Sequence, residues 1–296
     1  MKKAVSFICS LAVLMSTAVS AVSAEETLDE KTYIPQIYFK ANPSETADIL
    51  PTGTVYFNTK ADGELKSQTG VYIKDELVRS GQIFLKWEWY DDKVYLANLN
   101  DPFENESIPP YNEFSSSIDI GKNYTPESKL MGISYGNIGT YEMLPLSLTG
   151  EKSDSYALAY FDINVADETP SDYYEIAFRT QQPNVSNIAY RLSDKSLRDL
   201  RPSGENAQPL TIAVSDRMLG DVNDDGIIDA TDASAVLSEY ALSSVNGDGE
   251  FTKAQLISAD VNGDKVVDAT DASSLLSYYA YTSVSDSIPL TEFMSR

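Results

Sequence analysis

The arrangement of apolar and polar residues divides the chain into three parts. A mostly apolar run, residues 4–15, follows Lys2 and Lys3 at the N-terminus. Between residues 31 and 216, short apolar or alternating runs are separated by turn-forming residues. Beyond residue 220, apolar residues recur three and four positions apart, in two copies. In chain order, these patterns predict a targeting segment, a region of β-strands and a region of α-helices.

The middle part predicts many short strands, rich in Tyr, Val and Ile and separated by turns such as Pro51-Thr52-Gly53. Such spacing favours an antiparallel β-sandwich, so the fold class is expected to be mainly β. Long helical periodicity is missing, apart from a predicted helical turn near Ser196–Leu200. The predicted strands are Ile34–Lys40, Gly53–Asn58, Gly70–Lys74, Gln82–Tyr90, Lys93–Asn98, Ser116–Ile120, Met131–Tyr135, Leu144–Leu148, Ser155–Val165, Tyr173–Arg179 and Leu210–Val214.

Two tryptophans lie two residues apart in one predicted strand. Trp87 and Trp89 therefore share a face with Ile83 and Leu85. An exposed aromatic strip of this kind could stack on sugar rings. The alternative is that this face points into the core, with Lys86 and Glu88 outside; the alternation with two charged residues favours this second interpretation.

The N-terminal segment has the composition of a secretory signal peptide. Two lysines precede a short apolar stretch, and small residues close the segment at Val22-Ser23-Ala24. The alternative is a buried N-terminal helix. Cleavage after Ala24, or after Ala21 as the alternative, would remove Cys9, the one cysteine of the chain. We therefore expect an exported protein whose mature form has no thiol.

The C-terminal third contains a duplication. Residues 220–241 and 259–280 are identical at 14 of 22 positions, at an offset of 39. Each copy carries oxygen-bearing side chains at positions 1, 3, 5, 9 and 12 of a loop, with a backbone carbonyl at position 7. This is the ligand spacing of an EF-hand calcium loop, although Asp replaces Glu at position 12. The predicted ligands are Asp221, Asn223, Asp225, Ile227, Asp229 and Asp232 for one Ca²⁺ ion, and Asp260, Asn262, Asp264, Val266, Asp268 and Asp271 for a second.

A helix is predicted after each loop. Its apolar residues fall at i, i+3, i+4 and i+7, which predicts one buried stripe for each helix. Between the two copies there is room for a short helix near Thr252–Ile257. The two stripes are expected to form the core of the small domain: Ala233, Val236, Leu237 and Tyr240 in the first copy, and Ala272, Leu275, Leu276 and Tyr279 in the second.

Composition and charge exclude several classes of function. The chain has 22 basic and 45 acidic residues, a formal net charge of −23, so it should repel nucleic acid and anionic membrane surfaces. It has 0 histidines, which excludes Ser-His-Asp and Cys-His catalysis and His-ligated metals. No second apolar segment approaches the length of a membrane span.

The duplicated loop–helix units resemble a dockerin domain. The resemblance covers about residues 220–280 and rests on the Asp-Val-Asn starts of both loops and the Thr-Asp-Ala-Ser helix entries. It implies a Ca²⁺-dependent module that binds a cohesin on a scaffoldin and places secreted proteins in a cellulosome, which degrades plant cell walls. Recognition in this family lies at loop positions 10 and 11 and in the following helix. Here those loop positions are Ala230, Thr231, Ala269 and Thr270.

One residue departs from the family pattern. The second loop has Lys265 at position 6, where glycine supplies the sharp turn. Placing this residue in left-handed geometry should cost roughly 1 kcal/mol. The sequence therefore raises the question of whether the second loop binds calcium as well as the first.

The β-rich part weakly resembles cohesin-like and carbohydrate-binding sandwiches, in the segments Ser155–Val165, Tyr173–Arg179 and Leu210–Val214. We predict a signal peptide at 1–24, a sandwich at 25–216, a dockerin at 217–282 and a tail at 283–296. Because only Ser215–Gly220 separates the last strand from the first loop, the two modules should be closely docked.

The expected function is that of a secreted, extracellular cellulosome component. In this interpretation the sandwich is a non-catalytic module that binds polysaccharide or another dockerin. The alternative is a small β-rich glycoside hydrolase or polysaccharide lyase carried by the same dockerin. Carboxylates such as Glu88 and Glu142 are numerous, but none stands in a motif assignable to a glycosidase, so catalysis is left open.

Overall fold

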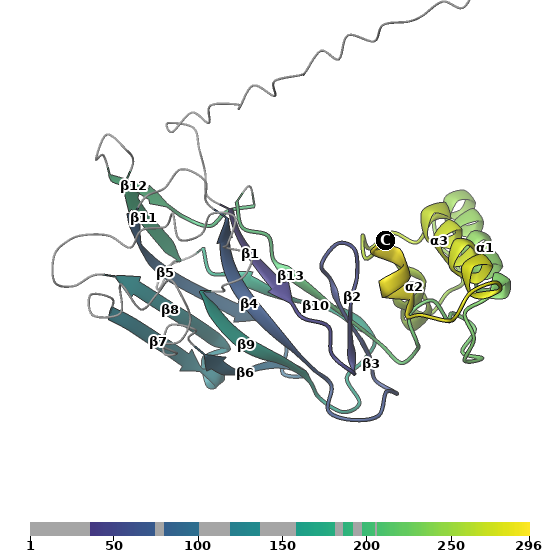
Figure 1. Ribbon diagram of the computed structural model, residues 1–296, viewed down its shortest axis with the longest axis horizontal. Coiled ribbons are helices and arrows are strands. Elements are labelled where there is room, and N and C mark those ends of the chain that lie inside the picture. The colour runs from purple at the N-terminus through teal and green to yellow at the C-terminus, as the bar shows by residue number, and fades with distance from the viewer. Residues whose placement is uncertain are drawn as a thin grey trace, which may run out of the picture.

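The computed structural model describes residues 36–74, 80–100, 119–136, 158–180, 186–191, 197–204 and 206–296. The predicted signal peptide, the predicted strand Leu144–Leu148 and Glu142 lie outside these residues. The described chain forms two sheets followed by four α-helices, with the helices gathered at one end of the sheets (Figure 1). This arrangement confirms the predicted fold class. No helix among these residues is both long and apolar enough to cross a bilayer.

The smaller sheet has four antiparallel strands in the part of the chain that the structure describes. In spatial order these are β1 (Gln36–Ala41), β4 (Lys66–Lys74), β9 (Ala159–Val165) and β6 (Val94–Asn100). All three pairings are antiparallel, and the β6–β9 pair contains an irregularity between Ala97 and Asn100. All four strands correspond to predicted ones.

Among the described residues, the larger sheet has nine strands and is built around β5 (Ser80–Trp89). One edge of β5 pairs with β8 (Leu130–Gly136), which pairs in turn with β7 (Asp119–Thr125). The short 3-10 helix η3 (Pro126–Ser128) joins β7 to β8. The other edge of β5 is shared by β11 (Asn187–Arg191) and β10 (Asp172–Phe178). Beyond these lie β12 (Leu197–Leu200) on one side, and β13 (Leu210–Ser215), β3 (Val55–Asn58) and β2 (Ala47–Ile49) on the other.

The inner faces of the two sheets enclose an aromatic core. Trp87 from the large sheet packs against Phe161 from the small one, with ring centroids 5.4 Å apart. Phe39 stacks on Phe178 with centroids 4.3 Å apart. Leu85 and Trp87 are both completely buried. The described strands therefore form a two-layer sandwich.

The prediction that Trp87 and Trp89 point into the core is confirmed. Trp89 is also buried, and both tryptophans belong to the sandwich core. One detail of the prediction is wrong, because Lys86 is buried although it was expected outside. Its aliphatic stem lies against Gly132 of β8, where a Cβ added to the glycine would meet the Lys86 Cγ. The outer face of strand β5 is therefore also covered at Lys86.

The predicted helical turn near Ser196–Leu200 is wrong. Residues Leu197–Leu200 form strand β12, which pairs antiparallel with β11. The apolar residues Leu197 and Leu200 match a helical turn in spacing, but pairing with a neighbouring strand decides the conformation. Strands β2 and β11 were not predicted.

The helical part contains α1 (Ala230–Asn246), α2 (Lys253–Ala259), α3 (Ala269–Thr282) and α4 (Leu290–Met294). Helix α2 confirms the short helix predicted between the repeats, and Thr252 is its N-cap. Helix α4 was not predicted. Leu290 of α4 is buried in the helical core, and the Phe293 ring packs against Tyr278 at a centroid distance of 5.6 Å.

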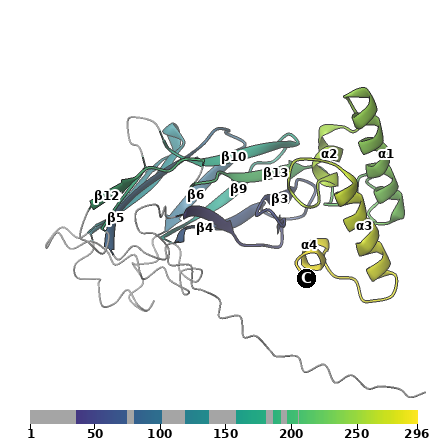
Figure 2. The same cartoon turned by 90° about the horizontal axis from the view of Figure 1, so that it is seen from above.

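The helical part and the sandwich share one apolar cluster. Leu50, Tyr56 and Ala213 of the sandwich pack in the same cluster as Val222 and Ile257. The Tyr56 hydroxyl also donates a hydrogen bond of 2.8 Å to the Arg217 carbonyl oxygen. Figure 2 shows α2 lying between the sandwich and the α1–α3 pair. The two modules are closely docked, as the short connection predicts; their sequence boundaries stay predictions.

Candidate calcium loops and docking surface

Each duplicated loop is organised around its position-1 aspartate. Asp221 and Asp260 are nearly completely buried, with exposed fractions of 2% and 1%. Each carboxylate accepts hydrogen bonds from the backbone N–H groups of positions 4, 5 and 6 of its own loop, at distances between 2.7 and 3.2 Å. Both loops are therefore wrapped around a carboxylate.

The position-12 aspartate closes each loop from the other side. Asp232 accepts hydrogen bonds from the N–H groups of Val222 and Asn223, and Asp271 accepts from the equivalent groups of its loop. Both aspartates are also the third residue of a helix, where they form a capping box with the position-9 aspartate. Asp229 and Asp268 are thus N-caps of α1 and α3 as well as predicted ligands.

The remaining predicted ligands lie on the outer side of each loop. The Asn223 amide donates to the Asp225 carboxylate at 2.9 Å, and Asn262 and Asp264 form the same 2.9 Å contact. At position 7, where the carbonyl is the predicted ligand, the side chains of Ile227 and Val266 are exposed by 61% and 55%. The structure brings the predicted side chains of each copy into one loop.

The backbone of each loop turns twice through left-handed geometry, at positions 4 and 6. In the first loop these positions hold Asp224 with φ 64° and Gly226 with φ 84°. In the second they hold Gly263 with φ 80° and Lys265 with φ 67°. The predicted left-handed conformation of Lys265 is confirmed. The second left-handed position was missed by the sequence analysis, although Gly263 was a visible signal.

Burial disfavours the charged forms of the innermost carboxylates. It raises the pKa of Asp232 and of Asp260, and it raises the pKa of Asp271 to about 6. The backbone hydrogen bonds that these groups accept lower the pKa and offset part of this effect. A cation beside them would favour the ionised forms.

These features fit calcium. The donors are all oxygens, as this hard ion requires, and the turned backbone already surrounds a buried carboxylate. Within the described chain, no three acidic side chains stand close enough to hold an ion by themselves. A bound ion would therefore also need the amide oxygen at position 3 and the carbonyl oxygen at position 7, which the ligand pattern includes.

The sequence of this region matches a known family. The model of the dockerin type I domain matches residues 219–278. These residues form a dockerin type I domain. The match covers both candidate calcium loops, helices α1 and α2 and most of α3, and it ends at residue 278, within α3.

The recognition positions implied by the dockerin resemblance lie at the surface. Thr231, Ala269 and Thr270 are exposed and Ala230 is half-buried. They stand at the first turns of α1 and α3. Both pairs are thus accessible in the presence of the sandwich.

The predicted apolar stripe of each dockerin helix is only half buried. Val236 and Leu275 are buried, as expected, but Leu237 is exposed by 42% and Leu276 by 43%. Tyr240 and Tyr279 are exposed by 42% and 41%. The prediction that all four positions of each stripe lie in the core is wrong. In each helix the buried residues instead recur at every third position, and this row continues to Glu239 in α1 and to Tyr278 in α3.

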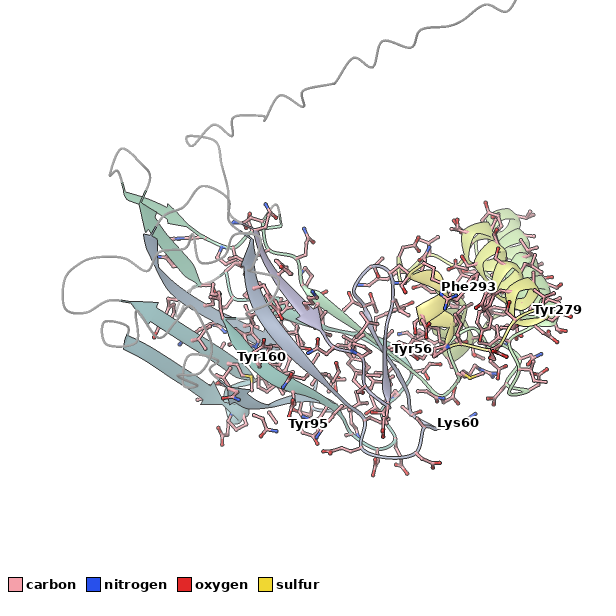
Figure 3. All side chains as sticks on the ribbon, viewed as in Figure 1. Tyr56, Lys60, Tyr95, Tyr160, Tyr279 and Phe293 are labelled. Atoms are coloured by element: carbon pink, nitrogen blue, oxygen red, sulfur yellow. The ribbon has the colours of Figure 1, made fainter. Side chains whose placement is uncertain are left out.

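The exposed half of the stripe forms matched pairs on the two helices. Leu237 and Tyr240 of α1 correspond to Leu276 and Tyr279 of α3 at the 39-residue offset of the repeat. Figure 3 shows Tyr279 on the side of the dockerin facing away from the sandwich. The dockerin therefore presents two similar apolar surfaces to solvent. We refer to these four residues as the exposed pairs.

Comparisons with solved structures found cohesins and cohesin–dockerin complexes. One is a type I cohesin–dockerin complex from Clostridium thermocellum, at 11% identity and a TM-score of 0.36, covering 62% of this chain and 99% of that one. Another is a type I cohesin from Pseudobacteroides cellulosolvens, at 9% identity and a TM-score of 0.37, with coverages of 61% and 92%. A third is a solution structure from Clostridium acetobutylicum, at 13% identity and a TM-score of 0.34, with coverages of 60% and 90%. No curated protein matches the chain.

Proposed function

We propose that this protein is an exported component of a cellulosome-type assembly, which docks through its dockerin to a cohesin on a scaffoldin. Calcium in both loops holds α1 and α3 in the orientation that the cohesin recognises. The sandwich acts as a non-catalytic binding or adaptor module within the machinery of plant cell-wall polysaccharide degradation.

The observation that carries this proposal is the exposed pairs, Leu237 with Tyr240 and Leu276 with Tyr279. Large apolar side chains exposed by about two-fifths, repeated on two adjacent helices, are typical of a surface that a protein partner covers. Each pair follows a calcium loop directly, through a helix that begins at the loop's own capping box. Calcium binding would thus determine the position of the docking surface.

Two observations support a non-catalytic sandwich. The Glu88 carboxylate, one of the conceivable catalytic acids, accepts a hydrogen bond of 2.6 Å from Arg179 in an ion pair. This carboxylate is therefore engaged in a structural ion pair within the sheet. Trp87 and Trp89 are buried in the core, so this strand offers no aromatic strip for sugar rings. These contacts argue against catalysis at Glu88 and against sugar stacking on this strand, and binding measurements decide between another dockerin and polysaccharide as the partner.

The docking proposal is tested by measuring the affinity of the full chain for a panel of immobilised cohesins. We expect binding in calcium and loss of binding after chelation with EDTA. Replacing both Tyr240 and Tyr279 by Ser should weaken binding at least tenfold. Tyr95→Ser is the matched control, because Tyr95 is also exposed by 42% but lies on the sandwich (Figure 3). Calcium-independent binding, or equal loss in the control, would contradict the proposal.

The role of the sandwich is tested with the same chain. Pull-downs with isolated dockerins and affinity gels of plant polysaccharides separate a protein partner from a sugar. Incubation with xylan, mannan, pectin and cellulose should release no reducing sugar. Reproducible release from any of the four would assign the sandwich to the hydrolases or lyases.

A further inference from the structure

A side chain of the sandwich reaches a predicted calcium ligand. The Tyr173 hydroxyl, from strand β10, donates a hydrogen bond of 2.8 Å to Oδ2 of Asp260, the position-1 aspartate of the second loop. The same Oδ2 accepts the N–H of Lys265 at 2.9 Å. Tyr173 lies 87 residues before Asp260 in the chain, so this contact exists only because the sandwich and the dockerin are docked.

The Tyr173 hydroxyl is the donor in this contact, because an ionised carboxylate can only accept hydrogen bonds. The Lys265 ammonium lies 5.7 Å from the centroid of the Tyr173 ring, so the same side chain also contacts the left-handed position of the loop.

The sandwich also holds the backbone of this loop. The Thr52 hydroxyl, in the turn between β2 and β3, donates to the Gly263 carbonyl at 2.9 Å, and Thr54 lies 3.4 Å from the same oxygen. A Cβ at Gly263 would collide with Thr52 and crowd Leu50. The close approach thus depends on glycine at this position.

The first loop provides an internal comparison. Within the described residues, the carboxylate of its position-1 aspartate, Asp221, has hydrogen bonds only from backbone N–H groups. The sandwich contacts this loop through an ion pair of 2.7 Å between Lys60 and Asp224. Asp224 is at position 4, which is not a predicted ligand, and both side chains of the pair are about half exposed. Among the described residues, a side chain of the sandwich therefore makes a hydrogen bond or ion pair to the carboxylate of a predicted ligand in loop two but not in loop one.

We propose that Tyr173 is a positioning residue for the second calcium loop, through which the sandwich and the ion in that loop stabilise one another. The proposal rests on calcium binding by the dockerin, as proposed above. A hydrogen bond from outside the loop orients the carboxylate before the ion arrives, and loss of such a partner typically costs 10- to 100-fold in metal affinity. By linkage, calcium in loop two strengthens the docking of the dockerin on the sandwich by the same factor.

The experiment measures calcium affinity of the full chain, one loop at a time. Asp225→Ala disables loop one and Asp264→Ala disables loop two; both residues are exposed and equivalent in the repeat. Tyr173→Phe is then introduced in each background, because it removes only the hydroxyl. Tyr174→Phe is the matched control, since its hydroxyl donates to the Pro170 carbonyl at 2.9 Å, away from both loops. Affinities come from competition with a chromophoric chelator.

With loop one disabled, Tyr173→Phe should raise the Kd of the remaining site 10- to 100-fold, and Tyr174→Phe should leave it unchanged. With loop two disabled, neither substitution should change the Kd. A purely structural loss would weaken both loops alike. Hydrogen exchange gives a second readout: calcium should slow exchange in β10 of the parent chain, and less so in the Tyr173→Phe chain.

An unchanged Kd for loop two in the Tyr173→Phe chain would overturn this inference and leave the proposed function intact. Equal losses in both loops would also overturn it, because the effect would then not pass through Asp260. If the unaltered chain binds no calcium at all, the calcium-dependent function itself is wrong, and the inference fails with it.

Discussion

At the scale of single residues, the two candidate calcium loops place their left-handed backbone strain on different residues. Both need left-handed backbone at positions 4 and 6, and each has one glycine for the two positions. In loop two the glycine is Gly263, where the contact with Thr52 leaves no room for a side chain. The free-energy cost of left-handed backbone in a residue other than glycine therefore falls on Lys265. In loop one it falls on Asp224, a residue type that adopts this conformation more readily.

The first prediction concerns Lys265→Gly. It should relieve roughly 1 kcal/mol of backbone strain and lose a contact with the Tyr173 ring worth about 0.5 kcal/mol at an exposed site. The net gain of about 0.5 kcal/mol corresponds to a roughly twofold higher calcium affinity of loop two. Chelator competition in the Asp225→Ala background measures it. The comparison is Asp224→Gly in loop one, measured in the Asp264→Ala background. A lower affinity would mean that the ring contact outweighs the strain.

The site residues were predictable where the ligands repeat within twelve positions. The carboxylates, the capping boxes and the strain at Lys265 all follow from local spacing, because a loop closes on itself within a few residues. Tyr173 and Thr52 were not predictable, because their partners lie 87 and 211 residues away. No local periodicity marks a residue whose role depends on how two modules dock.

At the scale of elements, the dockerin helices bury a narrower face than their apolar pattern predicts. A small core cannot surround each helix, so only one row of side chains, three residues apart, is fully covered. In α1 this row ends at Glu239, which is 4% exposed and accepts hydrogen bonds from the N–H groups of Glu250 and Phe251. A buried acid satisfied by a neighbouring turn thus occupies a position that the apolar pattern assigns to solvent.

The second prediction uses two adjacent leucines of α3. Leu275 is completely buried and Leu276 is exposed by 43%. Leu275→Ala should destabilise the dockerin by about 2–5 kcal/mol, because it leaves a cavity. Leu276→Ala should cost about 0.5 kcal/mol or less, as surface substitutions do. Thermal denaturation of the full chain in calcium compares them; equal losses would place Leu276 in the core.

Strands were predicted well where apolar residues alternate over several positions and poorly where they do not. The core strands β5, β9 and β13 carry strong patterns, because one face of each is packed against the opposite sheet. Strand β2 has three residues, and β12 has a sequence compatible with a turn of helix. Such short elements form because a neighbouring strand offers hydrogen bonds, which a single sequence does not record.

At the scale of the whole molecule, the dockerin is held against the sandwich rather than suspended on a linker. The contact combines the shared apolar cluster with several polar contacts. One of these is an ion pair of 2.6 Å between Lys253 of α2 and Asp172 of β10. Another is the hydrogen bond of 3.1 Å from Thr291, in α4, to Asp48. The recognition positions at the first turns of α1 and α3 nevertheless stay accessible.

This arrangement bears on how a cohesin would bind. Both helices begin with Ala-Thr at loop positions 10 and 11, and the exposed pairs are matched in type and nearly equal in exposure. Rotating the dockerin by half a turn about the axis relating its two repeats would present a similar surface. The sandwich contacts the body of loop two but leaves Ala269 and Thr270 exposed. We therefore propose that the dockerin binds one cohesin in two orientations, through either helix.

The third prediction tests the two orientations with Ala230→Glu and Ala269→Glu. Each residue is the first of its helix, where a carboxylate is favourable for the helix dipole, so the fold should be retained. Either change alone should reduce cohesin affinity by less than about 1 kcal/mol, because the other helix still binds. Both together should cost roughly 2–5 kcal/mol, since an unpaired charge is then buried in whichever interface forms. Calorimetric titration of the full chain in calcium measures all three. If one single change abolishes binding and the other has no effect, one helix makes all the contacts and the repeat serves only to hold the second ion.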